Sequence, residues 1–120
     1  MKIEFDNNVP IYLQLLDYIK IYIITGQITC GSKLPSVREL ANEFKVNPNT
    51  IQKALSELED TGLIYTERTN GKFVTNDHKT IDNLKKSYAN QVIKDFYQKM
   101  TDLGFSKSET INLLKEESEK

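Results

Sequence analysis

Residues 36–58 read SVRELANEFKVNPNTIQKALSEL, and the first part of this stretch is typical of a short amphipathic helix. Ser36 and Glu39 have the spacing of a capping box, in which each side chain binds a backbone N–H at the start of a helix. Lys45 and Val46 then leave room only for a tight turn. Between the capping box and this turn, apolar residues recur at i, i+3, i+4 and i+7 and give one buried face: Val37, Leu40, Ala41 and Phe44.

A second helix is predicted directly after this turn. Asn47 is a good N-cap, Pro48 suits the first helical position, and Gly62 ends the helix. The same apolar spacing returns at Ile51, Ala54, Leu55 and Leu58. Two short helices that each have one buried face and are joined by a tight turn indicate a helix-turn-helix.

Downstream, the pattern changes to that of a β-hairpin. Two β-prone runs, residues 63–67 and 72–75, flank the loop Arg68-Thr69-Asn70-Gly71. Asn-Gly between such runs is a strong signal for a hairpin turn. A hairpin that follows a helix-turn-helix predicts a winged helix.

Upstream, Pro10 suits the first turn of a helix that we expect to end near Gly26. β-branched residues in its second half also allow a strand, but continuity with the first half favours the helix. Its apolar stripe is Ile11, Leu15, Leu16, Ile19, Tyr22 and Ile23. The predicted fold class is therefore mainly α (α+β), with a winged helix-turn-helix domain over residues 1–76.

The remaining residues, 77–120, predict a helical tail. A long helix is expected from Asp77 to Gly104, and Ser106 with Glu109 forms a second capping box that opens a last short helix. The apolar stripe of the long helix is wider than contact with one neighbouring helix requires. We therefore expect a two-helix dimerisation region, whose contact residues are Ile81, Leu84, Tyr88, Val92, Phe96 and Met100.

The composition argues against several classes of protein. The 120 residues contain one cysteine, Cys30, and one histidine, His78, so that no disulfide framework or Cys/His metal cluster can form within one chain. No nucleophile–base pair and no clustered glycines are present, so we predict no enzyme, no cofactor and no metal. Lys20 interrupts the longest apolar stretch, and no signal pattern is visible. We expect a cytoplasmic protein without a membrane segment.

The helix that begins at Pro48 has an outward face that fits DNA recognition. This face is polar and not acidic, because the carboxylates Glu57, Glu59 and Asp60 fall in the last turn. Asn and Gln suit adenine edges, Lys suits guanine or phosphate, and a recognition helix reads bases mainly through its N-terminal half. The candidate residues are Asn47, Asn49, Thr50, Gln52 and Lys53, with Ser56 behind them. A merely solvated face is the alternative reading.

Two further groups extend this candidate site. Arg38 and Ser36 open the preceding helix, where a cation and free backbone N–H groups suit a phosphate; a surface ion pair is the alternative for Arg38. The hairpin tip offers cations and a glycine that permits close approach to the minor groove or backbone; a solvated tip is its alternative. The tip candidates are Arg68, Asn70, Gly71 and Lys72.

The net charge of the chain does not exclude DNA binding, and it predicts how that binding depends on salt and on base contacts. The chain carries −1 overall, and residues 32–75 hold six Lys and Arg against six Asp and Glu. The two kinds of charge are not evenly distributed, because most of the cations fall near the proposed DNA side and three of the carboxylates fall at its far end. We expect weak, salt-sensitive non-specific binding and strong dependence on base readout by a dimer.

Several runs resemble the GntR family of bacterial transcription regulators, over residues 9–64: Val9-Pro10-Ile11-Tyr12-Leu13-Gln14-Leu15, Gly31-Ser32-Lys33-Leu34-Pro35-Ser36-Val37-Arg38-Glu39-Leu40-Ala41, Val46-Asn47-Pro48-Asn49-Thr50-Ile51-Gln52-Lys53-Ala54-Leu55 and Gly62-Leu63-Ile64. The resemblance implies DNA contacts by Arg38, Asn47, Asn49, Thr50, Gln52 and Gly71. The family wing usually reads Arg-Gly-x-Gly-Thr-Phe-Val. Here only Gly71 remains, and we expect Asn70 to supply part of the tolerance for positive φ.

The short tail is similar to that of the YtrA subfamily, whose two helices serve dimerisation and whose members often control transporter operons. The resemblance therefore implies a homodimeric repressor that binds double-stranded DNA at an inverted repeat. No sequence feature specifies a small-molecule effector. The alternative is a winged-helix protein-interaction module that uses the apolar tail and binds no DNA.

Overall fold

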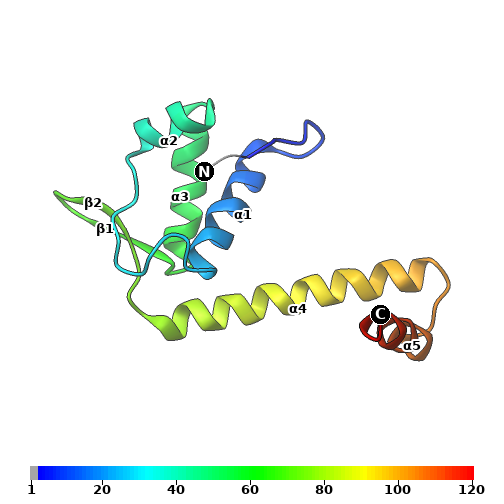
Figure 1. Ribbon diagram of the computed structural model, residues 1–120. Coiled ribbons are helices and arrows are strands. Elements are labelled where there is room, and N and C mark those ends of the chain that lie inside the picture. The colour runs from blue at the N-terminus through cyan, green and yellow to red at the C-terminus, as the bar shows by residue number, and fades with distance from the viewer. Residues whose placement is uncertain (1–2) are drawn as a thin grey trace. The chain divides into compact units, whose positions relative to one another are not determined.

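The computed structural model describes residues 3–120 and divides them into two compact units, the first ending at Asn83 and the second starting at Leu84. The predicted order of elements is confirmed (Figure 1). The elements are α1 (Ile11–Ile24), α2 (Val37–Phe44), α3 (Pro48–Asp60), β1 (Ile64–Glu67), β2 (Gly71–Val74), α4 (His78–Asp102) and α5 (Lys107–Ser118).

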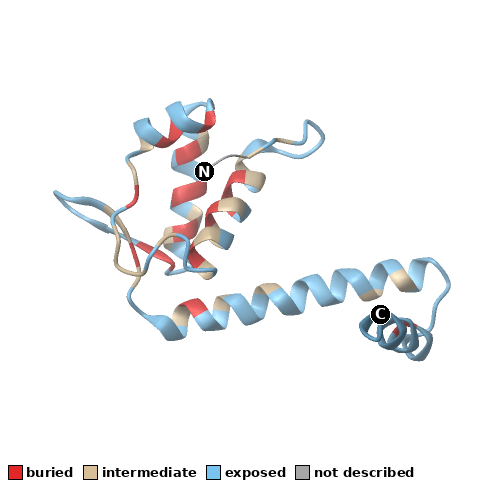
Figure 2. Ribbon diagram, in the orientation of Figure 1, coloured by how far each residue is buried: buried red, intermediate tan, exposed pale blue. Residues whose placement is uncertain are grey.

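The core of the first unit lies between α1, α2 and α3. Both α1 and α2 pack against α3, and Figure 2 shows the buried positions concentrated on these helices and at the base of the hairpin. The predicted buried face of α3 is confirmed in full. The prediction for α1 is wrong for Ile11, which is 43 % exposed because it is the first helical residue, one turn before the first buried one, Leu15.

The hairpin is antiparallel and pairs Thr66 with Lys72 and Glu67 with Gly71. The segment before α2 extends this small sheet, because the Leu34 N–H donates to the Lys72 carbonyl at 2.8 Å. The tip takes its positive φ at Gly71, where φ is 101°. The expectation for Asn70 is therefore wrong. Its φ is not positive, since in this register the residue that needs positive φ is the one opening β2.

The turn before α2 docks onto the segment that leads into α4. The Gly31 N–H donates to the Val74 carbonyl at 2.9 Å, and a Cβ at Gly31 would collide with the amide oxygen of Asn76. Beside it, Cys30 Sγ lies 3.9 Å from His78 Nδ1. The sequence did not predict that these two side chains meet.

The first turns of α4 belong to the first unit. Ile81 is only 6 % exposed there and packs in the core of the first unit. The stretch of α4 that follows lies in the second unit. The boundary between the two units therefore lies inside α4, between Asn83 and Leu84.

In the second unit, described residues 84–120, the only buried residue is Thr110. Its hydroxyl donates to the Ser106 carbonyl at 2.9 Å, next to the predicted capping box of α5, which is confirmed. The large apolar side chains of this unit are exposed: Val92, Ile93, Phe96, Leu103, Phe105, Ile111, Leu113 and Leu114. The other predicted contact residues, Leu84, Tyr88 and Met100, are half-buried. None of the helices in the described chain is long and apolar enough to cross a membrane.

Candidate nucleic-acid interface

The outward face of α3 presents amide and hydroxyl groups to solvent. Asn49, Gln52 and Lys53 are exposed, as are Asn47 and Ser56, whereas Thr50 is half-buried. Asn47 also begins the helix, because its side-chain oxygen accepts the Asn49 N–H at 2.8 Å. This bond leaves the amide NH₂ of Asn47 as its free group, which is a donor. The face therefore offers both donors and acceptors to base edges.

Lys53 has a partner that sequence reasoning missed. Its ammonium nitrogen lies 3.8 Å from the ring centroid of Tyr12, which projects from α1. A cation over a tyrosine ring is attracted by the negative face of the ring, and this contact restricts where the lysine side chain points. The available signal was that Tyr12 lies outside the buried stripe of α1 while belonging to the motif Pro10-Ile11-Tyr12.

At the start of α2, the predicted capping box is confirmed. Ser36 Oγ accepts the Glu39 N–H at 3.1 Å, and Glu39 Oε1 accepts the Ser36 N–H at 3.2 Å. These bonds hold the pKa of the Glu39 carboxyl below its ordinary value of 4.5. Arg38 is exposed and makes no hydrogen bond or ion pair within residues 3–120. Its guanidinium is therefore available to a phosphate, together with the N–H groups of the first turn that the box leaves open.

At the hairpin tip, Arg68 is exposed and, in the described part of the chain, forms no ion pair. Asn70 is turned back along the hairpin, with its amide nitrogen 3.1 Å from Glu67 Oε2. The tip and the start of α2 line one cleft of about 450 Å³, which also contains Lys33 and Lys72. The structure thus brings two of the predicted groups, Ser36 and residues 68–72, to the same cleft.

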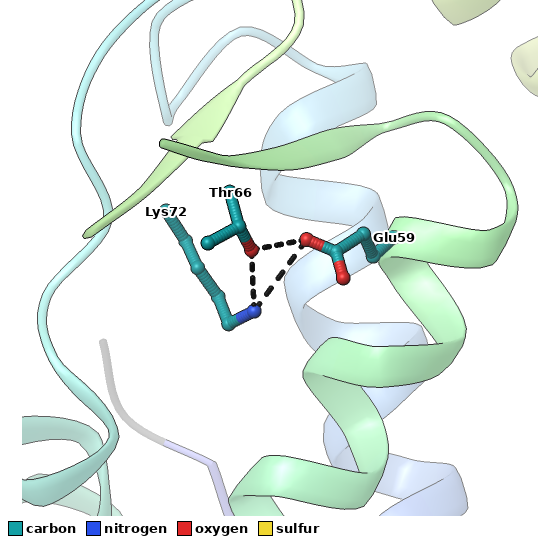
Figure 3. Close-up of polar contacts among 3 residues, drawn as sticks. All are labelled: Glu59, Thr66 and Lys72. Carbon is teal, nitrogen blue, oxygen red and sulfur yellow. Dashed lines mark hydrogen bonds and ion pairs between the residues drawn. The ribbon is translucent and has the colours of Figure 1, made fainter. Parts of the chain in front are cut away.

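Lys72 is not free at the tip. Its ammonium donates to Thr66 Oγ1 at 2.8 Å and lies 3.5 Å from Glu59 Oε1, and the Thr66 hydroxyl also donates to Glu59 (Figure 3). The hydrogen bond from Thr66 is the main cause that lowers the pKa of Glu59 below 4.5, and Lys72 adds to it. A contact between Lys72 and phosphate would have to compete with this cluster. Glu59 was expected to lie away from the DNA, but its bonds to the hairpin were not predicted.

Comparison with known proteins identifies the winged helix. The family model described as "Bacterial regulatory proteins, gntR family" matches residues 11–74. The uncharacterized HTH-type transcriptional regulator YhcF of Bacillus subtilis is 39 % identical over 93 % of this chain and 93 % of its own. The HTH-type transcriptional repressor YtrA of the same organism is 41 % identical over 67 % of this chain and 62 % of its own.

Solved structures agree with these matches. A GntR family transcriptional regulator from Listeria monocytogenes superposes with a TM-score of 0.85 at 45 % identity, covering 93 % of this chain and 98 % of the other. The DNA-binding domain of AraR, in a crystal structure with operator ORE1, has a TM-score of 0.54 at 31 % identity and covers 62 % of this chain and 94 % of the other. The chain therefore belongs to the GntR family and is a winged-helix DNA-binding transcriptional regulator rather than an enzyme.

Proposed function

We propose that this regulator is a homodimeric repressor that binds an inverted-repeat operator, with one winged helix on each half-site. The observation that carries the proposal is the exposed, polar and non-acidic N-terminal half of α3. The repressor YtrA, similar in sequence, and the AraR domain, crystallised with operator DNA, support it. By its resemblance to the YtrA subfamily, we also propose a transporter operon as the target and the cytoplasm as the place of action.

Within this proposal, contacts divide into three kinds. Asn47, Asn49, Thr50, Gln52 and Lys53 enter the major groove and read base edges. Ser36 and Arg38 bind phosphate, because a helix N-terminus and a free guanidinium favour an anion. The tip residues contact the minor groove or the backbone: Arg68, Asn70, Gly71 and Lys72.

Homodimerisation is supported by the composition of the second unit. A pair of helices whose large apolar residues are exposed and whose only buried residue is a threonine has no core of its own within residues 84–120. Exposed apolar patches of this kind mark interfaces. A second copy of the chain would cover Val92 and Phe96 with the same patch of its own surface, as a two-fold interface requires.

Selection of bound DNA from a random pool tests the function. The full chain is incubated with the pool, and bound duplexes are amplified and sequenced over successive rounds. We expect enrichment of two half-sites in inverted orientation with a fixed spacing, because a dimer places its two recognition helices at a fixed separation. A pool that stays unenriched would favour the protein-interaction module over DNA recognition.

A further inference from the structure

The hairpin is held to the rest of the first unit on two sides. Along one edge, Leu34 bonds to Lys72 and Lys33 forms an isolated bridge with Phe73. On the other side, the last turn of α3 reaches the hairpin through Glu59. Beyond these attachments, residues 68–70 have hydrogen bonds only to Glu67, within the part of the chain that is described.

Glu59 contacts both strands at one level. Thr66 and Lys72 are cross-strand partners, and both side chains meet the same carboxylate oxygen of Glu59 (Figure 3). The Lys72 side chain is 19 % exposed and that of Glu59 38 %, so the cluster is partly shielded from water. Each of the three groups bonds to the other two, and such a closed cluster restrains both strands with respect to the helix.

We infer that Glu59 is a positioning residue for DNA recognition, which fixes the hairpin relative to α3 so that Arg68 and the base-reading face engage one DNA site together. This inference rests on the proposed DNA-binding function. Only the Glu67–Gly71 pair separates the Thr66–Lys72 pair from the hairpin tip, so a change of angle at Thr66–Lys72 displaces the tip. Arg68 is the exposed cation that such a displacement would move.

The sign of the expected effect separates this role from simple electrostatics. A carboxylate near DNA repels phosphates, so its neutralisation ordinarily strengthens binding. A positioning role predicts the opposite for Glu59. Asp60 is the matched control, because it is the next residue on the last turn of α3, is exposed, and has no bond to the hairpin within residues 3–120.

The experiment measures affinity for a selected operator by fluorescence anisotropy, with the full chain and its variants. Glu59→Gln and Thr66→Val are each expected to weaken binding about fivefold, equivalent to about 1 kcal/mol. Thr66→Ser keeps the hydroxyl and should restore wild-type affinity, and Asp60→Asn should bind as well as wild type or better. Thermal melts accompany each variant. If Glu59→Gln does not fold, the Thr66→Val and Thr66→Ser pair decides the matter.

A double-mutant cycle between Glu59 and Arg68 measures the coupling of their effects on affinity, which a merely stabilising role of Glu59 would leave at zero. If Glu59 acts by placing Arg68, then Glu59→Gln should cost less than about twofold once Arg68→Ala is present. Glu59→Gln or Thr66→Val binding as tightly as wild type, or losses that add fully with Arg68→Ala, would overturn the inference while operator binding by the wild type stands. Failure of the wild type to bind any selected DNA would instead reject the proposed function.

Discussion

The cations of the proposed interface differ in how far their charge is already engaged. Lys72 is bound to Glu59 and Thr66, and Lys53 lies over the ring of Tyr12. Arg38 and Arg68 are exposed and unpaired within residues 3–120. Electrostatic attraction to phosphates therefore depends mainly on the two arginines, since a charge that is already paired releases fewer counterions on binding.

Arg38→Ala is expected to weaken binding to specific and random duplexes alike. Loss of one phosphate contact should reduce the slope of log affinity against log salt concentration by about 1. Titrations at several salt concentrations measure the slope, and Lys115→Ala in α5 is the charge-matched control. A slope that is unchanged in Arg38→Ala would remove Arg38 from the phosphate contacts.

The capping box of α2 makes stability dependent on pH. The pKa of Glu39 is lowered by its bonds to Ser36, so the ionised carboxylate stabilises the folded state above its ordinary pKa of 4.5. This contribution is lost as the pH falls from 4.5 through the lowered value. Glu39→Gln should therefore unfold at a lower urea concentration than wild type at pH 7, and the difference should shrink as the pH falls below 4.5. A pH-independent difference in urea midpoint would show that the charge does not matter.

At this scale, the sequence predicted what is local and missed what is distant. The two capping boxes and the Asn47 cap were predicted because their partners lie two or three residues apart. The contacts of Lys53 with Tyr12 and of Lys72 with Glu59 were not, because they join different elements and depend on how those elements pack. Both unpredicted contacts involve a lysine that was expected to be available for DNA.

At the scale of elements, the helices were predicted where the period of the apolar residues was clear. The spacing of apolar residues predicted α2 and α3 with their buried faces, because a 3.6-residue period on a short helix admits one packing side. Val37 is the exception, since it is half-buried at the start of α2. The apolar repeat of α4 runs through Ile81 without a break, so periodicity alone does not mark where the first unit ends. Only the fold shows that Ile81 is buried in the first unit while Val92 is exposed in the second.

The docked turn at residues 29–32 offers a stability test at the same scale. Gly31→Ala and Gly26→Ala both place a side chain at positive φ, at a cost of about 1–2 kcal/mol. Gly31→Ala should destabilise the protein further, because the added Cβ collides with Asn76, whereas nothing lies within 4 Å of a Cβ at Gly26. Urea denaturation measures both. The excess should disappear when Asn76→Ala is added, and equal losses in the two single variants would contradict the observed docking.

For the whole molecule, the proposal requires two copies of the chain. Val92→Asp should produce a monomer in analytical ultracentrifugation, because a charge within an apolar interface must be desolvated. Asn90→Asp adds the same charge to an exposed position, two residues away and so on the opposite side of α4, and should remain a dimer. A dimer that persists in Val92→Asp would place the interface elsewhere.

The central claim is that this chain reads DNA sequence through α3, and a paired titration tests it most directly. The full chain and its Asn49→Ala variant are each titrated against a selected operator and a shuffled duplex at one salt concentration. We predict that the wild type prefers the operator by at least about a thousandfold, and that Asn49→Ala loses about 1–3 kcal/mol on the operator alone. Equal affinities of the wild type for the two duplexes, or equal losses on both in the variant, would contradict the account.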